Sequence, residues 1–235
     1  MKKPFSLRKF LPIYVIVLIG CLLAAVVGSR TVTVMVENAP LKNRTFIVVD
    51  AGHGGIDGGA TSCSGILESH TNLEIALRLN DLLRLLGYDT RMVRTTDTSV
   101  YTEGNSIAAQ KISDLKQRVK LVNETDNALL ISIHQNTFSD SRYRGAQVFY
   151  ADDDISRHLA DKLQTVFRDT INPGSRRKSK PSDGVYLMQH IQRPGLLVEC
   201  GFISNPEEDA LLQNDTYQKK MVCVIATVIS SHANL

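Results

Sequence analysis

The stretch that decides the fold is Val48-Val49-Asp50-Ala51-Gly52-His53-Gly54-Gly55-Ile56-Asp57-Gly58-Gly59-Ala60. Its first residues continue an apolar run that begins at Phe46, and a short apolar run bounded by a turn is typical of a buried strand. The strand breaks into a loop with five glycines and one histidine, His53. Glycines permit positive φ and close approach to a ligand, so the loop can cradle a phosphate, hold a metal ligand or simply turn the chain.

Like the first strand, two later predicted strands carry a histidine or a glutamate near their C-terminal end. The loop itself lacks both the Lys-Ser/Thr ending and the G-x-G-x-x-G spacing of phosphate loops, which favours the metal interpretation. A second apolar run, Ala128 to His134, ends in a histidine, and a third, Gly195 to Gly201, carries Glu199 near its end. Ligands of open α/β sheets bind beyond the carboxyl ends of the strands, so we expect His53, His134 and Glu199 to meet there.

The rest of the chain alternates between strand and helix patterns, which predicts an α/β fold with a mostly parallel central sheet flanked by helices. Thr71 and Glu74 form a capping-box pattern that predicts a helix from Thr71 to Leu86, ended by Gly87. A polar segment, 94–114, is expected to be a surface loop with a little helix near 107–112. The other expected strands are Asp89–Val93, Gly145–Tyr150 and Gly184–Met188, and the other expected helices are Leu115–Asn123, Ile155–Thr170, Asn205–Leu212 and Thr216–Ser230.

The N-terminus predicts export. Residues 1–9 carry four basic residues and no acid, and the run from Phe10 to Val27 is apolar and uncharged. Its length favours an uncleaved membrane anchor over a cleaved signal peptide. A third interpretation is a lipoprotein site at Cys21. The apolar run continues beyond this cysteine, which argues against it. We therefore divide the chain into a signal or anchor segment (1–28), a connector (29–44) and one catalytic domain (45–235) outside the cytoplasmic membrane, either membrane-anchored or secreted.

The charge argues against a nucleic-acid-binding protein, and the cysteine content argues against a disulfide framework or a cysteine-type zinc site. Beyond residue 9, 23 basic residues face 24 acidic ones, so the exported part is nearly neutral and is not expected to bind nucleic acid. The one basic cluster, 176–180, is interpreted as a solvated loop, with contact to an anionic polymer as the alternative. Three cysteines in the domain, Cys63, Cys200 and Cys223, form no disulfide or zinc pattern, and the last two are expected to be buried.

The predicted cluster suits a hydrolytic zinc site. Such a site takes three protein ligands and leaves a position for water. His53 and His134 supply two, and Glu68, just before the helix that follows the glycine loop, is the best-placed third. Glu199 can then act as the general base and acid that moves a proton from water to the leaving nitrogen.

These residues resemble a known family. The glycine loop, Glu68, Ser132-Ile133-His134-Gln135-Asn136 and Val198-Glu199-Cys200-Gly201-Phe202-Ile203-Ser204-Asn205 resemble the zinc-dependent N-acetylmuramoyl-L-alanine amidases of bacterial cell walls. The resemblance runs from about Thr45 to Ser230. It implies hydrolysis of the amide between the lactyl group of muramic acid and the first L-alanine of the peptidoglycan stem peptide. It also implies that His53, Glu68 and His134 bind Zn²⁺ and that Glu199 is catalytic.

The apolar N-terminus and the segment Gly184-Val185-Tyr186-Leu187-Met188-Gln189 narrow the resemblance to germination-specific amidases of endospore formers. This subgroup implies spore-cortex peptidoglycan as substrate, muramic-δ-lactam formation, and a location between the forespore membranes. A regulatory protein partner is compatible with this picture, and the oligomeric state stays open. A zinc peptidase that cuts within stem peptides and an inactive peptidoglycan-binding module remain alternatives.

Two residues are weaker candidates for substrate binding. Asn136 follows a ligand, and its alternative role is to form a turn. Asp57 either orients the imidazole of His53, touches substrate or stabilises the turn.

Overall fold

The computed structural model describes residues 45–232, which belong to one compact unit. The proposed anchor and connector, 1–44, lie outside the described residues. Within 45–232, no helix has the length and apolar character needed to cross a membrane.

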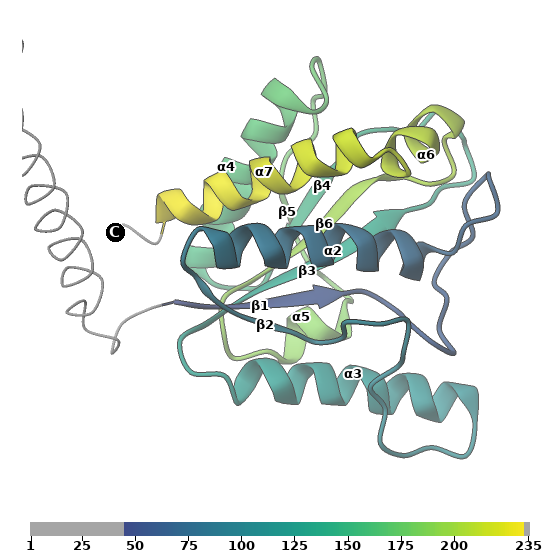
Figure 1. Cartoon of the computed structure of the whole chain (residues 1–235), viewed down its shortest axis with the longest axis vertical. Helices are drawn as coiled ribbons and strands as arrows, with labels where there is room; N and C mark the ends of the chain where they lie inside the picture. Colours follow the sequence, from purple (N-terminus) through teal and green to yellow (C-terminus); the bar gives the residue numbers. More distant parts are fainter. Residues whose placement is uncertain (1–44, 233–235) are drawn as a thin grey trace, which may run out of the picture. The chain divides into compact units, whose positions relative to one another are not determined.

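A six-stranded mixed sheet forms the centre of the molecule (Figure 1). Its strand order is β2-β1-β3-β6-β4-β5. All neighbouring strands run parallel except β4, which is antiparallel to β6. The strands are β1 (Phe46–Ala51), β2 (Asp89–Met92), β3 (Ala128–Asn136), β4 (Gln147–Tyr150), β5 (Lys180–Pro181) and β6 (Gly195–Phe202).

Helices cover both faces of this sheet, as Figure 1 shows. One face carries α2 (Glu68–Leu85), α4 (Asp154–Thr170) and α7 (Asp215–His232), with α6 (Pro206–Leu212) packed beside β6 and α7. The other face carries α3 (Ile107–Asn123) and the short α5 (Tyr186–His190). Because β1, β3 and β6 are covered on both faces, they are almost entirely buried.

Three predicted elements were wrong in type or extent. The residues 184–188 were expected to form a strand, but Tyr186 to His190 form α5, which packs against α3. The helix α3 begins at Ile107, where the hydroxyl of Ser106 accepts a hydrogen bond from the Ala109 amide, so the helix expected near 107–112 forms and joins the helix expected at 115–123 in a single element. The helix α2 begins at Glu68, and the capping box at Thr71 does not form because that residue is already inside the helix.

The cysteine prediction was correct for one residue and wrong for another. Cys200 is fully buried, whereas Cys223, expected to be buried, is exposed on α7. Cys63 is also exposed.

The direction of each strand determines which loops meet at the functional edge. The carboxyl ends of β1, β3 and β6 lie together, as the parallel register of their pairs requires. Because β4 runs the other way, its amino end reaches this edge. The loop before β4, residues 137–146, therefore lies beside the ends of the parallel strands.

Candidate metal centre

Three side chains from separate elements converge at this edge. His53 follows β1, Glu68 begins α2, and His134 lies on β3. The Glu68 carboxylate bridges the two rings, with His53 Nε2 at 3.3 Å from Oε2 and His134 Nδ1 at 3.1 Å from Oε1. One ligand atom from each residue lies within 4.8 Å of the others, which is the arrangement needed to surround a single metal ion.

Two glycines make room for these side chains. A Cβ atom on Gly52 would lie 2.2 Å from the ring of His134, and one on Gly59 would lie 2.6 Å from Glu68 Oε2. Gly59 also has a positive φ of 70°. These two glycines therefore leave space for the side chains of the proposed ligands.

The backbone at His53 is held by two buried arginines. His53 has a φ of 60°, an uncommon conformation for a residue other than glycine. Arg118, on α3, donates to the carbonyl oxygens of His53 at 2.8 Å and Ala51 at 3.0 Å. Arg94 donates to the carbonyl oxygens of Ala51 at 2.9 Å and Gly52 at 3.0 Å. These contacts fix the loop in the strained conformation that aims the imidazole at Glu68.

Asp50 neutralises Arg118 beneath the loop. Its carboxylate pairs with the Arg118 guanidinium at 2.5 Å and accepts a hydrogen bond from Ser132 Oγ at 2.6 Å. Burial opposes the charged form of Asp50, but Arg118 and the Ser132 hydroxyl hold its pKa below the usual range. Asp114 completes the ion cluster at 2.5 Å from the Arg118 Nε atom.

Asp57 orients the imidazole of His53. Its carboxylate accepts a hydrogen bond from His53 Nδ1 at 2.8 Å, which leaves Nε2 facing Glu68. Its other oxygen pairs with Lys111, from α3, at 2.7 Å. A carboxylate on the far nitrogen of a histidine fixes its tautomer and direction, as is usual for metal-binding histidines.

The electrostatics of the cluster suit a divalent cation. Burial disfavours the charged form of His53, but Glu68 and Asp57 raise its pKa to about 9. Burial alone would raise the pKa of Glu68, and the two histidines instead hold it well below its usual range. The carboxylates that stabilise a proton on His53 would also stabilise a metal ion, and a set of two imidazoles and one carboxylate suits zinc.

Glu199 lies beside this cluster on β6. It is the register partner of His134 in the parallel pair β3 and β6. Its Oε2 atom is buried and has no hydrogen-bond partner among residues 45–232. Burial raises the pKa of Glu199 to about 7, and the nearby Glu68 also raises it, against the effect of the histidines. A buried carboxyl group free to exchange a proton near neutral pH suits general acid and base catalysis.

A cavity of about 310 Å³ opens over this site and is lined by His53, Asp57, His134 and Glu199. Val185 and Leu187, from the segment that forms α5, provide an apolar wall. Asn136 does not line this cavity, and its carbonyl oxygen accepts a hydrogen bond from the Ile203 amide. A role for Asn136 in substrate binding stays a prediction.

Sequence reasoning missed Arg118, Arg94 and Lys111 as parts of the site. The sequence offered one signal, which is Arg118 in the predicted helix 115–123. A buried arginine needs a charged partner, and Arg118 is buried. That partner, Asp50, is 68 residues away in the sequence.

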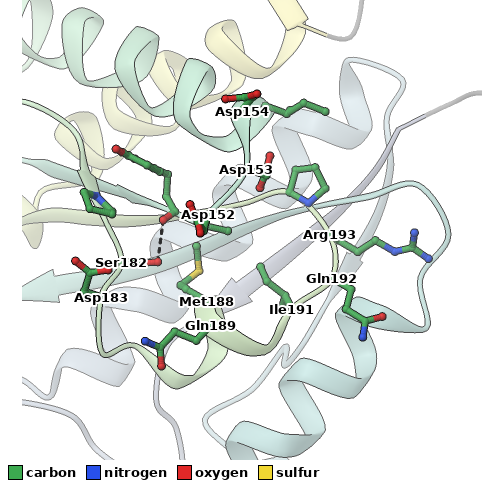
Figure 2. Close-up of a pocket in the computed structure, with 15 residues that line it drawn as sticks. Asp152, Asp153, Asp154, Ser182, Asp183, Met188, Gln189, Ile191, Gln192 and Arg193 are labelled. Carbon is green, nitrogen blue, oxygen red and sulfur yellow. Dashed lines mark hydrogen bonds between the residues drawn. The ribbon is translucent and has the colours of Figure 1, made fainter.

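A larger hollow of about 840 Å³ lies away from the cluster (Figure 2). It is lined by the end of β4, the start of α4 and the segment around α5. Ser182 Oγ donates to the carbonyl oxygen of Tyr150 at 2.8 Å, and a dashed line marks a hydrogen bond at Ser182 in Figure 2. Of its acidic residues, Asp153 already caps α4 through Ser156. None of the proposed ligands lines this hollow.

At its edge, the α/β sheet gathers two histidines and a glutamate that could hold a metal ion, with a second glutamate beside them, which is the arrangement expected of a metal-dependent hydrolase. The chain belongs to the Amidase_3 family of N-acetylmuramoyl-L-alanine amidases, whose model matches residues 47–231. It is therefore an enzyme of that type, as its sequence motifs predicted. The peptidase and inactive-module alternatives are not favoured by this membership.

Similar proteins agree with this membership. The germination-specific N-acetylmuramoyl-L-alanine amidase of Bacillus subtilis is 38% identical over 192 residues, which cover 79% of this chain and 78% of that protein. The CwlD amidase of Clostridioides difficile, solved in complex with the GerS lipoprotein, matches with a TM-score of 0.77 and 35% identity, over 82% of this chain and 99% of that one. An N-acetylmuramoyl-L-alanine amidase from Clostridium difficile 630 matches with a TM-score of 0.69 and 27% identity, over 82% and 98%.

Proposed function

We propose that this amidase is zinc-dependent, that His53, Glu68 and His134 bind the ion, and that Glu199 is the catalytic acid and base. The observation that carries this proposal is the approach of three ligand atoms to within 4.8 Å of one another, next to a carboxylate oxygen without a partner. Asp57 holds His53 in the orientation that binding requires.

Hydrolysis adds water across the amide between the lactyl carbonyl and the nitrogen of L-alanine. When bound, zinc supplies Lewis-acid chemistry, since it polarises a carbonyl and lowers the pKa of water. Glu199 takes one proton from the attacking water and gives it to the leaving nitrogen. A carbon–oxygen bond forms, the carbon–nitrogen bond breaks, and the products are a lactyl carboxyl group and the free amino end of the stem peptide.

The biological substrate we propose is spore-cortex peptidoglycan, in which removal of the peptide prepares muramic acid for conversion to the δ-lactam. The 38% identity to a germination-specific amidase supports this role. We also propose that residues 1–28 anchor the chain, residues 29–44 link it, and the catalytic domain acts outside the cytoplasmic membrane, between the forespore membranes. The GerS complex of a similar amidase supports a protein partner for this chain as well.

Digestion of purified peptidoglycan tests the reaction directly. We expect mass spectrometry to find glycan strands without peptides and intact stem peptides that begin with L-alanine. Products shortened within the stem peptide would support a peptidase instead. Removal of metal with a chelator should abolish the reaction, and added zinc should restore it.

A further inference from the structure

A groove of about 800 Å³ lies between the loop that precedes β4 and the segment that follows α4. Five cationic side chains line it: Arg144, Arg176, Arg177, Lys178 and Lys180. Among the residues that the structure describes, Arg144 alone of these five has a carboxylate within ion-pair distance, namely that of Glu207 at 3.3 Å, and both of those side chains are exposed. The groove therefore presents a local surplus of positive charge, although basic and acidic residues beyond residue 9 nearly balance, at 23 and 24.

Arg177 gives this basic segment a defined position. Its Nε atom donates to the carbonyl oxygen of Arg144 at 3.0 Å, and its guanidinium lies 4.8 Å from the centre of the Phe202 ring. Its Nη1 atom also reaches Gln147 Oε1 at 3.5 Å. The segment 176–180 is thus attached to the sheet edge, which a freely solvated loop would not be.

One residue of the groove lies opposite Glu199 in the sheet. Gln147 lines the groove and is the direct register partner of Glu199 in the antiparallel pair β4 and β6. Opposite residues of such a pair share one face of the sheet, with Cα atoms about 5 Å apart. A ligand whose reacting bond lies at Glu199 therefore needs to extend by only a few residues to reach the cations.

We propose that this groove binds the carboxylates of the peptidoglycan stem peptide during cleavage. The inference rests on the amidase reaction. It identifies the direction in which the stem peptide extends from the scissile amide. One extended peptide residue spans about 3.5 Å, so carboxylates two or three residues beyond the scissile amide reach the groove. The peptide carries negative charge, whereas an N-acetylated glycan backbone does not, so charge favours the peptide as occupant.

The test removes charge from the groove and from the ligand independently. In the full chain, purified in detergent, Arg176→Gln, Lys178→Gln and Lys180→Gln are combined. The matched control combines Arg84→Gln, Lys116→Gln and Lys162→Gln, three exposed cations outside the groove that have no ion-pair partner within residues 45–232. The substrates are a muropeptide with free carboxylates and the same compound with its carboxylates converted to amides.

For the acidic muropeptide, the groove variant should raise KM about tenfold, equivalent to ~1.4 kcal/mol, with little change in kcat. For the amidated compound, the wild type should show a KM that is raised by about the same factor. The groove variant should not raise the KM for the amidated compound any further. The difference should shrink with added salt, because exposed charges are screened. The control variant should behave as the wild type.

A binding measurement separates this inference from the reaction itself. Calorimetry on a Glu199→Gln background gives the Kd of the acidic stem peptide without turnover. If the wild type cleaves neither substrate but binds the acidic peptide more tightly than the groove variant does, the proposed reaction fails, and the groove remains a carboxylate-binding site without a part in cleavage. Equal Kd values for groove and control variants, or equal losses for acidic and amidated ligands, would overturn the inference. If a phosphate polymer binds the wild type more tightly than the groove variant, while both bind the stem peptide equally, the groove is a site for an anionic polymer and the inference is wrong.

Discussion

At the scale of single residues, the proposed site assigns metal binding and proton transfer to different side chains. Glu199→Gln keeps the volume of the side chain but removes the exchangeable proton. We expect zinc content to be unchanged and kcat to fall by about a hundredfold or more. His134→Ala should instead lose zinc together with activity. Elemental analysis and a turnover assay on both variants check this, and near-normal turnover of Glu199→Gln would remove this residue from the reaction.

Gly52 offers a second test at this scale, because its role is space. In Gly52→Ala the new methyl group would lie 2.2 Å from the His134 ring, so the ring must move away from Glu68. We expect weaker zinc binding and a large loss of activity, measured by metal titration. Gly58→Ala is the control in the same loop, because its methyl group would contact the movable end of Leu67 at 3.1 Å. Equal losses in both variants would show that the loop tolerates no side chain anywhere.

At the scale of elements, a buried ion cluster joins β1, β3 and α3 beneath the glycine loop. The pKa of Asp50 is lowered by Arg118 and Ser132, so the folded state binds a proton less readily than the unfolded state. Its contribution to stability is therefore present above the unfolded pKa of about 3.9 and is lost as pH falls toward the folded value.

Urea unfolding between pH 3 and 7 measures this dependence. Asp50→Asn should lower the free energy of unfolding by about 3 kcal/mol at pH 7, because it leaves Arg118 with less compensation in a buried site. It should also flatten the loss of stability below about pH 4. Asp126→Asn, at a fully exposed position, should change neither. An acid dependence as steep in Asp50→Asn as in the wild type would contradict the role of this cluster.

The same scale shows what could be predicted from the sequence. The strands β1, β3 and β6 were predicted because a strand covered on both faces reads as an uninterrupted apolar run. The residues 184–188 misled because a short apolar run does not distinguish a strand from a helix, and packing against α3 decided the outcome. The start of α2 was missed because Glu68 has no capping pattern before it, and bonds to Ala60 and Asn72 fix its position instead.

The sequence predicted the candidate site residues better than the arginine contacts that hold the glycine loop in place. His53, His134 and Glu199 each lie at or near the end of a recognisable strand, so topology alone brought them together. The arginine contacts to the glycine loop depend on carbonyl oxygens contributed by distant segments, and no local pattern marks them.

At the scale of the whole molecule, the N-terminal segment should decide where the enzyme acts. Deletion of residues 1–28 should release the protein from membranes while leaving its amidase activity intact, because the proposed site lies entirely within residues 53–199. Fractionation and a turnover assay on the deleted chain check both parts. Continued membrane association would mean that another surface holds the protein.

The reversed direction of β4 has a consequence for how such enzymes diversify. Because β4 runs antiparallel to β6, the loop that precedes it, 137–146, reaches the edge of the sheet that carries His134 and Glu199, yet it contributes none of the proposed metal ligands and not the proposed catalytic glutamate. Insertions and substitutions in this loop can therefore reshape what the enzyme accepts while its chemistry is inherited unchanged.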